Sequence, residues 1–476
     1  MRVVSIIGPE QAGKTTIAAQ LAGLEGGNPK SVELFSGVKA CKFSFMGEAW
    51  VIFDLVGGVQ NIPSQLSTLI ASDIVIVAVP GNTTAGVLTS PYIRFCEELD
   101  IPTVVFINKL DVTDVGIGEL IAVVQQYSQK TITLRQVPIR KDNSIIGVVD
   151  LISERAWQYQ DGARSNLISM PEQAFERTEE AREVLLEQLS DFDDSLLETL
   201  LEERKPATPD VFKIAQRTMM DHGIVSCVIG SAQAGNGMLR LMKLLRHETP
   251  HVRYLFDRLK RKTSQEVAFV ACGGDFVKHL GQLTLIRPLL KSISPGQEFY
   301  QQLMGPITDF DLKTNIKTLE AGCVGIALKS PHLQLQNPCY VDKGSPIAVD
   351  WTGPTAPNFK ELLKPKSDKD DSKLASALLK IAAIDAGIKT ERDPLSGYVS
   401  AATHGVTHRK RVIEKIESVF DVSPLSDVQI PAYREALRKP KERFYRHKKH
   451  AGGAGQFADV VIEAVPLKRG ECFVFS

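Results

Sequence analysis

The first residues of the chain have types and a spacing that suit phosphate chemistry. Gly8 ends the apolar run Val3–Ile7, and Gly13, Lys14 and Thr15 complete the pattern Gly-x-x-x-x-Gly-Lys-Thr. Glycines allow successive backbone N–H groups to face an anion, Lys14 can reach terminal phosphates, and the Thr15 hydroxyl can ligate Mg²⁺. The apolar run predicts a strand and the residues after Thr15 a helix, whose N-terminus adds positive charge. The flanks therefore favour a nucleotide phosphate site over a glycine-rich surface turn. The loop residues expected to bind the nucleotide are Gly8, Gln11, Ala12, Gly13, Lys14, Thr15 and Thr16.

A second element follows the apolar segment Ala49–Leu55, which predicts another strand. Asp54 and Gly57 form an Asp-x-x-Gly motif there, and only this position after a phosphate loop gives the short motif meaning. In that place Asp54 can hold Mg²⁺ and the Gly57 N–H can contact a γ-phosphate. Lys14, Asp54 and Gly57 are therefore the candidate catalytic residues, with Thr15 and Asp54 as the candidate metal ligands.

A third element predicts the base. Asn108, Lys109 and Asp111 form Asn-Lys-x-Asp directly after the expected strand Thr103–Ile107. Ligands bind at the carboxyl ends of strands in parallel sheets, so this location suits a nucleotide. The Asp111 carboxylate can accept hydrogen bonds from N1–H and the 2-amino group of guanine, which adenine does not offer, and Lys109 would lie along the base plane. The sequence thus predicts GTP or GDP, with Mg²⁺, as cofactors.

A weaker signal completes the predicted base site. The strand expected at Gly223–Gly230 ends in Ser231 and Ala232, whose backbone amides could receive the guanine O6. A Ser-Ala pair is uninformative alone and is used only because it falls where the rim of the base site is expected.

Composition sets broad limits. The 476 residues are 43% hydrophobic and 24% charged with a net charge of zero, which is typical of a multidomain globular protein and gives no global argument for nucleic acid binding. The seven cysteines include no Cys-x-x-Cys pair, which favours reduced thiols. No apolar run approaches the roughly 20 residues that span a bilayer, and the first strand begins too early for a signal peptide. We therefore expect a cytoplasmic protein without a membrane partner.

Taken together, the phosphate loop, the Asp54–Gly57 element, Asn108–Asp111 and GSAQAGNG at 230–237 resemble a translational GTPase of the elongation factor G kind. The segments 137–157 and 191–203 resemble the subdomain that this family carries within its GTPase domain. The resemblance implies a monomeric translation elongation (translocation) factor that hydrolyses GTP and has the ribosome, its RNA and proteins, as partner.

The sequence departs from the family at the position that orients the attacking water. The family has His directly after Asp-x-x-Gly, whereas this chain has Gly58, and a glycine cannot orient water or donate a proton. Gln60 is a nearby substitute that lies two residues away. The loss of such a group can cost several orders of magnitude in rate.

A second departure concerns the threonine that binds Mg²⁺ in the family's first switch segment. No threonine lies between Thr16 and Thr68, and Ser31 or Ser36 would have to serve. Three interpretations stay open: a GTP-hydrolysing translocation factor, a GTP-binding but hydrolysis-deficient ribosome-associated paralogue or degenerate fragment, and an unrelated phosphate-loop ATPase or kinase. Asn108 and Asp111 argue against the last.

The predicted fold class is multidomain α/β. A phosphate-loop GTPase domain, with a parallel sheet and helices on both faces, precedes a β-barrel, a small α/β domain and a partial fourth α/β domain within which the chain is expected to end. The expected divisions are the GTP-binding domain at 1–254 with an insert at about 112–222, the barrel at 255–352, a linker at 353–372, the small α/β domain at 373–425 and the partial domain at 426–476.

The segment at 438–450 combines basic residues with aromatic ones. Clustered Lys and Arg neutralise phosphates, and aromatic rings can stack on bases. A solvated basic edge is the alternative interpretation, but in the family this region approaches ribosomal RNA. The candidate RNA-binding residues are Arg446, His447, Lys448, Lys449 and His450.

Overall fold

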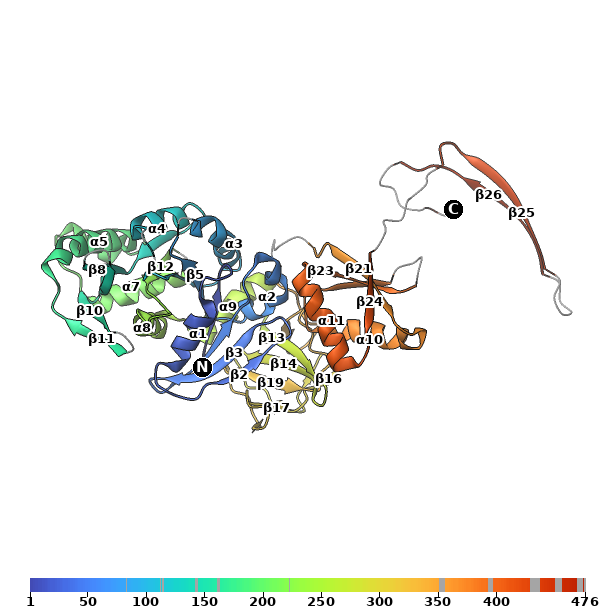
Figure 1. Cartoon of the computed structure of the whole chain (residues 1–476), viewed down its shortest axis with the longest axis horizontal. Helices are drawn as coiled ribbons and strands as arrows, with labels where there is room; N and C mark the ends of the chain where they lie inside the picture. Colours follow the sequence, from blue (N-terminus) through green and yellow to red (C-terminus); the bar gives the residue numbers. More distant parts are fainter. Residues whose placement is uncertain are drawn as a thin grey trace. The chain divides into compact units, whose positions relative to one another are not determined.

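The computed structural model describes residues 1–82, 84–111, 113, 115–141, 144–160, 163–221, 223–350, 356–392, 397–428, 437–449, 456–468 and 474. The chain divides into two compact units, Met1–Asp427 and Val428–Ser476, and each is described by itself. Figure 1 shows the course of the chain. The expected fold class is confirmed in outline, because a GTPase-type sheet with helices is followed by further sheet-rich domains.

The nucleotide-site domain is built on a mixed sheet in which eight described strands pair. The strands from β4 to β7 in the spatial order are parallel, whereas β2 and β3 are antiparallel additions at one edge. The order is β2 (Lys30–Glu33), β3 (Lys39–Phe45), β4 (Glu48–Asp54), β1 (Arg2–Ile7), β5 (Ile74–Pro80), β6 (Thr103–Asn108), β12 (Ile224–Ile229) and β7 (Thr131–Leu134).

Helices cover both faces of this sheet, as its sequence requires. Every residue of β5 is buried, which only a strand covered on both faces can achieve. In β1, Val3 and Ile7 belong to one apolar cluster, while Val4 and Ile6 belong to the other. The first cluster includes residues of α2 (Ile62–Ile70), α3 (Ala85–Glu98), α4 (Ile117–Gln125) and α9 (Val252–Thr263), and the second includes residues of α1 (Lys14–Gly23) and α8 (Met238–Glu248).

The inserted segment forms a second sheet of its own. Its antiparallel strands are β8 (Gln136–Lys141), β9 (Ser144–Asp150), β10 (Arg155–Gln160) and β11 (Ala163–Ile168), and its helices are α5 (Glu172–Ser190), α6 (Asp194–Leu201) and α7 (Thr208–Met220). The separate sheet begins later than the expected bound near residue 112. The reason is that α4 and β7 still belong to the first domain, where β7 pairs with β12.

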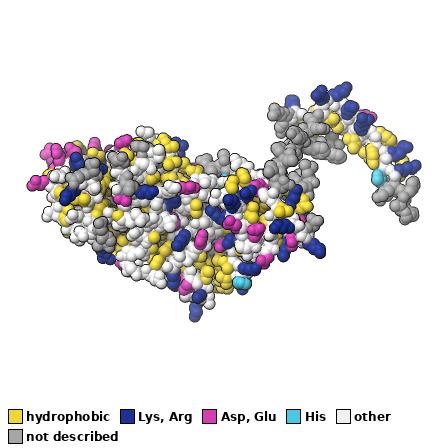
Figure 2. Space-filling view, viewed as in Figure 1, with side chains coloured by type: hydrophobic (Ala, Val, Ile, Leu, Met, Phe, Trp, Pro, Cys, Tyr) yellow, Lys and Arg dark blue, Asp and Glu magenta, His cyan; other side chains and the backbone are white. Residues whose placement is uncertain are grey.

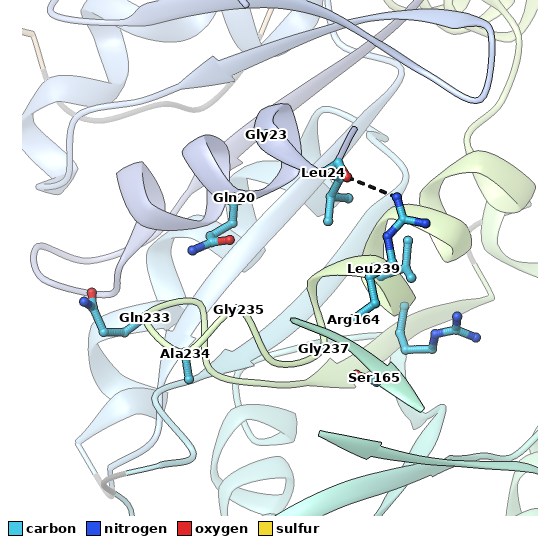
Figure 3. A pocket seen from close by; sticks show the side chains of 11 residues that line it. Gln20, Gly23, Leu24, Arg164, Ser165, Gln233, Ala234, Gly235, Gly237 and Leu239 are labelled. Atoms are coloured by element: carbon cyan, nitrogen blue, oxygen red, sulfur yellow. Dashed lines mark hydrogen bonds between the residues drawn. The ribbon is translucent and has the colours of Figure 1, made fainter. Parts of the chain in front are cut away.

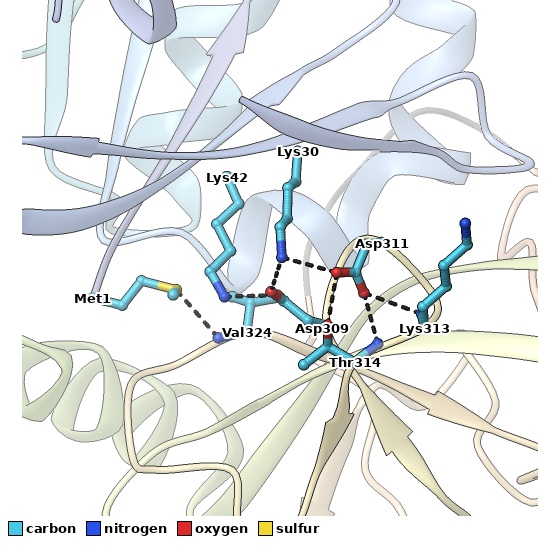
Figure 4. A network of polar contacts seen from close by, with 8 residues as sticks. All are labelled: Met1, Lys30, Lys42, Asp309, Asp311, Lys313, Thr314 and Val324. Atoms are coloured by element: carbon cyan, nitrogen blue, oxygen red, sulfur yellow. Dashed lines mark hydrogen bonds and ion pairs between the residues drawn. The ribbon is translucent and has the colours of Figure 1, made fainter. Parts of the chain in front are cut away.

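The next domain consists of short antiparallel strands. Its larger sheet contains β18 (Asn315–Ile316), β17 (Ile307–Thr308), β19 (Gly325–Leu328), β14 (Gly281–Pro288), β13 (Val267–Val277) and β20 (Cys339–Val341), and β15 (Glu298–Phe299) pairs with β16 (Gln302–Leu303). Lys30 and Lys42, from the edge strands of the first domain, form ion pairs of 2.7–2.9 Å with Asp309, and Lys30 also pairs with Asp311 (Figure 4). These ion pairs join the edge of the first sheet to the second domain.

A buried ion pair also joins these two domains. Arg287 Nη2 lies 2.8 Å from Asp73 Oδ2, and both side chains are about 99% or more buried. Asp73 Oδ2 also accepts a hydrogen bond from the Val3 N–H at 2.8 Å, while Arg287 donates to the carbonyl oxygens of Ala71 and Gly322. Because both charges are removed from water, loss of either side chain would leave the other charge buried without its ion-pair partner and would destabilise the fold.

The segment at 353–372 was expected to be a linker, and this expectation is wrong from Phe359 onward. Phe359–Pro365 forms β21, which pairs with β23 (Val399–Thr403) in a four-stranded sheet with β22 (Lys389–Arg392) and β24 (Pro424–Val428). The Leu362 and Leu363 side chains are buried, which explains why a Lys- and Pro-rich segment still forms a strand. The turn η2 (Asp368–Asp370) leads into α10 (Asp371–Ala383), and α11 (Val406–Phe420) completes this small α/β domain.

The second unit contains one long hairpin among its described residues. β25 (Lys441–Lys449) pairs antiparallel with β26 (Gln456–Ala464), residue for residue from Lys441–Ala464 to Lys449–Gln456. Within the described part of the whole chain, none of the helices has the length and apolar character needed to cross a bilayer.

Replacing Arg287 by Ala tests the ion pair between the first two domains. We expect Arg287→Ala to lower the free energy of unfolding by about 3–5 kcal/mol, because it leaves the Asp73 carboxylate buried without its ion-pair partner. Thermal unfolding followed by circular dichroism measures this as a lower melting temperature. Arg253→Ala is the matched control, because its pair with Asp257 is exposed and such pairs contribute about 0.5 kcal/mol or less. Equal melting temperatures for the two variants would contradict the assignment.

Candidate nucleotide site

The phosphate loop lies at the carboxyl end of β1 and ends at the first turn of α1. Gly8, Gln11 and Gly13 have φ values of 144°, 63° and 89°, so two of the three special positions are held by glycine, which adopts positive φ without strain. Gly13 also serves as the N-cap of α1 without a side-chain hydrogen bond, so the first N–H groups of the helix are available to an anion.

Lys14 lies folded over this loop. Its Nζ donates to the carbonyl oxygens of Gly8 at 3.1 Å and Pro9 at 2.8 Å, and the residue is only 7% exposed. Burial lowers the pKa of Lys14, although the nearby charges of Asp54 and Glu10 oppose that change. A poorly hydrated ammonium group at the centre of the loop is suited to pair with a phosphate, which would replace the solvation that it has lost.

The two candidate metal ligands meet each other. Thr15 Oγ1 donates a hydrogen bond of 2.7 Å to Asp54 Oδ2, so α1 and the end of β4 bring a hydroxyl and a carboxylate together. Burial raises the pKa of Asp54, opposed by the Thr15 hydrogen bond and by Lys14 and Lys39. Hydroxyl and carboxylate oxygens are ligands that Mg²⁺ prefers, and a cation would compensate the charge of the half-buried carboxylate. The donor set therefore fits the expected ion.

Gly57 and Gly58 follow at the edge of the phosphate loop. A Cβ at Gly57 would lie 2.8 Å from both Lys14 Nζ and the Glu10 amide nitrogen, so only glycine fits this approach. Gly58 has a φ of 95°, and its N–H donates to the Tyr92 hydroxyl at 2.9 Å. A Cβ at Gly58 would meet the Gln60 amide at 2.5–2.8 Å. Position 58 therefore carries no side chain for water, and its backbone conformation disfavours one.

Asn108 joins the phosphate loop to the expected base site. Its Nδ2 donates to the Ala12 carbonyl at 2.9 Å, and its Oδ1 accepts from the Ala232 N–H at 2.9 Å. The residue is only 2% exposed, and a Cβ at Gly13 would lie 2.3 Å from Nδ2. Asn108 was predicted as a nucleotide-binding residue, and the structure shows it as the brace that sets the distance between two binding loops.

The remaining base-site candidates lie at the carboxyl ends of β6 and β12. Lys109 has a φ of 65° and is half-buried, whereas Asp111 is exposed. Ser231 and Ala232 are buried, and Ser231 is held by reciprocal backbone hydrogen bonds with Asn236. The parallel neighbours β6 and β12 thus bring together two motifs that are more than 100 residues apart in the sequence.

The substitutes considered for the missing switch threonine lie in different surroundings. Ser31 is an exposed residue of the edge strand β2. Ser36 is buried, and its carbonyl oxygen accepts a hydrogen bond of 2.9 Å from Arg411 of α11. Their roles as metal ligands stay predictions.

Sequence reasoning missed Tyr92. Its side chain is 2% exposed, and burial raises the pKa of its hydroxyl, which stays protonated near neutral pH and accepts from Gly58. The residue lies on the buried face of α3, 34 positions from its partner. A periodic apolar pattern marks such a tyrosine as core and gives no signal of contact with a binding loop.

The sheet, the phosphate loop and the base-site loops define a phosphate-loop GTPase domain. The family model described as the elongation factor Tu GTP binding domain matches residues 36–251, and the model of elongation factor G domain IV matches residues 430–476. The first match begins after the phosphate loop, so residues 8–16 support the same class independently.

Comparison with whole proteins extends this likeness along the chain. An elongation factor G-like protein of Synechocystis sp. is 26% identical over 504 aligned positions, which cover all of this chain and 74% of that protein. A crystal structure from Thermus thermophilus has the same fold, with a TM-score of 0.80 and 21% identity over 97% of this chain and 72% of the other. The chain is therefore similar along its whole length to the elongation factor G-like translational GTPases. This similarity argues against the alternative of an unrelated ATPase or kinase.

Asp111→Asn tests the prediction that Asp111 selects the base. We expect the affinity for GDP to fall about 100-fold and that for xanthosine diphosphate to rise, because an amide donates where guanine also donates and xanthine accepts. Fluorescence titration with labelled GDP and competing nucleotides measures both changes. Asp100→Asn, on the loop after α3, is the control. Unchanged preference for guanine in Asp111→Asn would remove the role given to this residue.

Proposed function

We propose that the protein is a GTP-binding translation factor that acts on the ribosome during elongation. One observation carries the proposal. At one edge of the sheet the structure brings together the phosphate loop, the Thr15–Asp54 pair, Gly57 and the base-site loops that Asn108 joins. The similarity to elongation factor G-like proteins supplies the expected partner and step. The monomeric state and the cytoplasmic location expected from the resemblance stay predictions.

In this proposal, each group of residues has a separate role in holding the nucleotide. The amides of the phosphate loop and the N-terminus of α1 surround the phosphates, and Lys14 pairs with the terminal ones. Thr15 and Asp54 would hold Mg²⁺, which neutralises phosphate charge when it is bound. Asp111 and the amides of Ser231 and Ala232 would read the guanine. Gly57 lies against Lys14 and Glu10, and its N–H would sense a γ-phosphate.

The hairpin of the second unit is the proposed RNA contact, and its register separates the predicted residues into two faces. Alternate residues of a strand point to opposite faces. One face carries Arg446, which pairs with Asp459 at 2.8 and 2.9 Å, together with Lys448 and the acidic Glu442 and Glu463. His450 lies outside the described residues, as do the domain markers at 431–435 and most of 452–457.

The opposite face of the hairpin lacks acidic side chains among those described. Lys441, Arg443, Tyr445 and His447 lie on it, opposite Ala464, Ile462, Val460 and Ala458. Figure 2 shows Lys and Arg side chains alternating with apolar ones along this hairpin. Cations without acidic neighbours beside an exposed tyrosine suit phosphate contact and base stacking, so this face is the better candidate for RNA.

A second candidate function, GTP binding without efficient hydrolysis, is favoured by one observation. Gly58 offers no side chain to orient water, and its N–H is held by Tyr92 with φ at 95°. Gln60 is exposed and lies beside Gly58, so its amide is present at the right loop, although nothing fixes its orientation toward a phosphate. Removing one positioned group costs about 100- to 1,000-fold in rate.

Sedimentation with ribosomes tests the proposed function. We expect the full chain to pellet with ribosomes in the presence of a non-hydrolysable GTP analogue, and about tenfold less with GDP or as Lys14→Ala. Arg443→Ala should weaken the complex and lower the slope of affinity against salt concentration by about one, the value for one phosphate contact. Arg446→Ala should change the affinity and this slope less, because Arg446 is already paired with Asp459. The proposal is contradicted if the chain does not sediment with ribosomes, or if it does so equally with the GTP analogue and with GDP.

Gly58→His tests the cause of slow hydrolysis. We expect wild-type GTP turnover to stay slow with ribosomes and Gly58→His to give no recovery, because the positive φ strains any side chain and Gln60 occupies its space. Single-turnover release of phosphate measures the rate. Gly58→Ala is the matched control, since it imposes the same strain without an imidazole. Rapid ribosome-stimulated turnover by the wild type would remove this second candidate. A Gly58→His rate about tenfold above that of Gly58→Ala would instead contradict the argument that backbone strain prevents recovery.

A further inference from the structure

A cavity of about 430 Å³ lies between the inserted sheet and α8, away from the nucleotide site. Strand β10 contributes Arg155 and Trp157, and α8 contributes Arg240 and Lys243. A second cavity of about 620 Å³ shares Arg240 and adds Arg164 of β11 together with α1 and the loop at 233–237 (Figure 3). The two cavities thus meet at one arginine.

Four cations converge on this junction without matching acids. Arg155, Arg164, Arg240 and Lys243 have no ion pair with another described residue. Burial lowers the pKa of Lys243, and repulsion from the other three adds to this effect, so their charges act on one another. Without an anion, the cluster is electrostatically unfavourable.

Two acidic residues, Asp150 and Glu248, also line the smaller cavity. Glu248 pairs with the buried Arg135 at 2.7 Å. Asp150 Oδ1 accepts hydrogen bonds from the N–H and hydroxyl of Ser153 at 2.8 and 2.7 Å. The Asp150 carboxylate partly offsets the charge of Arg240. Arg135, Arg155, Arg240 and Lys243 outnumber the two carboxylates, so the lining keeps a surplus of positive charge.

Buried donors without acceptors point to a missing partner. Arg135 Nε, Trp157 Nε1 and Arg240 Nε are each buried and lack a hydrogen-bond acceptor among the described residues, and all three residues line the smaller cavity. Arg135 itself is only 3% exposed. Because an unsatisfied buried donor costs free energy, a ligand that brings acceptor oxygens would stabilise this arrangement.

An aromatic wall completes the cavity. The Arg240 guanidinium lies 3.7 Å from the centre of the Trp157 ring, and Lys243 lies 5.9 Å from it. The Phe212 and His247 rings, which also line the cavity, lie 5.8 Å apart. Stacking on Trp157 holds Arg240 in place, so the cation is oriented before a ligand binds.

We propose that this junction is a binding site for a small phosphorylated molecule that carries more than one phosphate group. Guanidinium groups bind phosphate oxygens in pairs, and several adjacent cations match a polyanion better than a single carboxylate. The cavity volumes are those of small-molecule sites, and the unsatisfied donors are buried, which favours a compact ligand over a nucleic acid strand. The site is separate from the GTP site and does not depend on the proposed function.

Calorimetric titration of the full chain with inorganic pyrophosphate tests the proposal. The protein is saturated with GDP and Mg²⁺ beforehand so that the phosphate loop is filled, and Lys14→Ala is titrated in parallel because its phosphate loop is impaired. We expect one pyrophosphate per chain in both proteins. Lys243→Gln should weaken binding about tenfold, whereas Lys213→Gln, the same change on the exposed face of α7, should leave it unchanged.

Further outcomes separate the alternatives. Arg155→Gln, at an exposed position, should give the same weakening if Lys243→Gln changes the melting temperature. Loss of the signal in Lys14→Ala but not in Lys243→Gln would assign the binding to the phosphate loop and overturn the proposal. If a short single-stranded RNA binds through Lys243 and pyrophosphate does not bind, the ligand of the site is RNA and the proposal of a small phosphorylated molecule is wrong. If pyrophosphate does not bind at all, the proposal is overturned as well.

Discussion

The nucleotide site depends on the buried side-chain amide of Asn108. One end of the amide holds the Ala12 carbonyl of the phosphate loop, and the other holds the Ala232 N–H of the base loop. Because both hydrogen bonds are removed from water, losing either leaves a buried polar group without a partner. The approach is so close that Gly13 has no room for a Cβ. One planar group thus fixes the spacing between the phosphate and base subsites.

The helix that follows Gly57 and Gly58 contacts both later domains of the first unit. In α2, the Thr68 hydroxyl donates to the Cys272 carbonyl of β13 at 2.6 Å. Ser64 lies beside Asp385, which is buried and hydrogen-bonded to His408 of α11 at 3.0 Å. Burial disfavours ionisation of Asp385, but His408, Ser64 and the Gly387 N–H together lower its pKa. A movement of α2 would therefore act on two domains at once.

Much of this architecture could be predicted because the signals were local. Apolar runs ended by Gly or by Asn-Lys indicated the strands β1, β6 and β12 to within about two residues, and the phosphate loop was clear from its own spacing. The strand β21 was missed because Lys and Pro dominate its composition, while two leucines supply its buried contacts. The bracing role of Asn108 was also invisible, since its partners lie 96 and 124 residues away. Tyr92 was hidden for the same reason. Its partner is a backbone N–H, which almost every residue has, so the sequence gives no sign of this contact.

The hydrogen bond between the Gly58 N–H and Tyr92 has a consequence for which mutations position 58 can accept. A backbone held at φ 95° accepts glycine readily and other residues poorly, so a mutation to histidine meets a cost before it brings any benefit. A side chain at position 58 would also require movement of Gln60, whose amide lies 2.5–2.8 Å from the position of a Cβ. A single substitution at this position is therefore disfavoured, and the local geometry favours glycine.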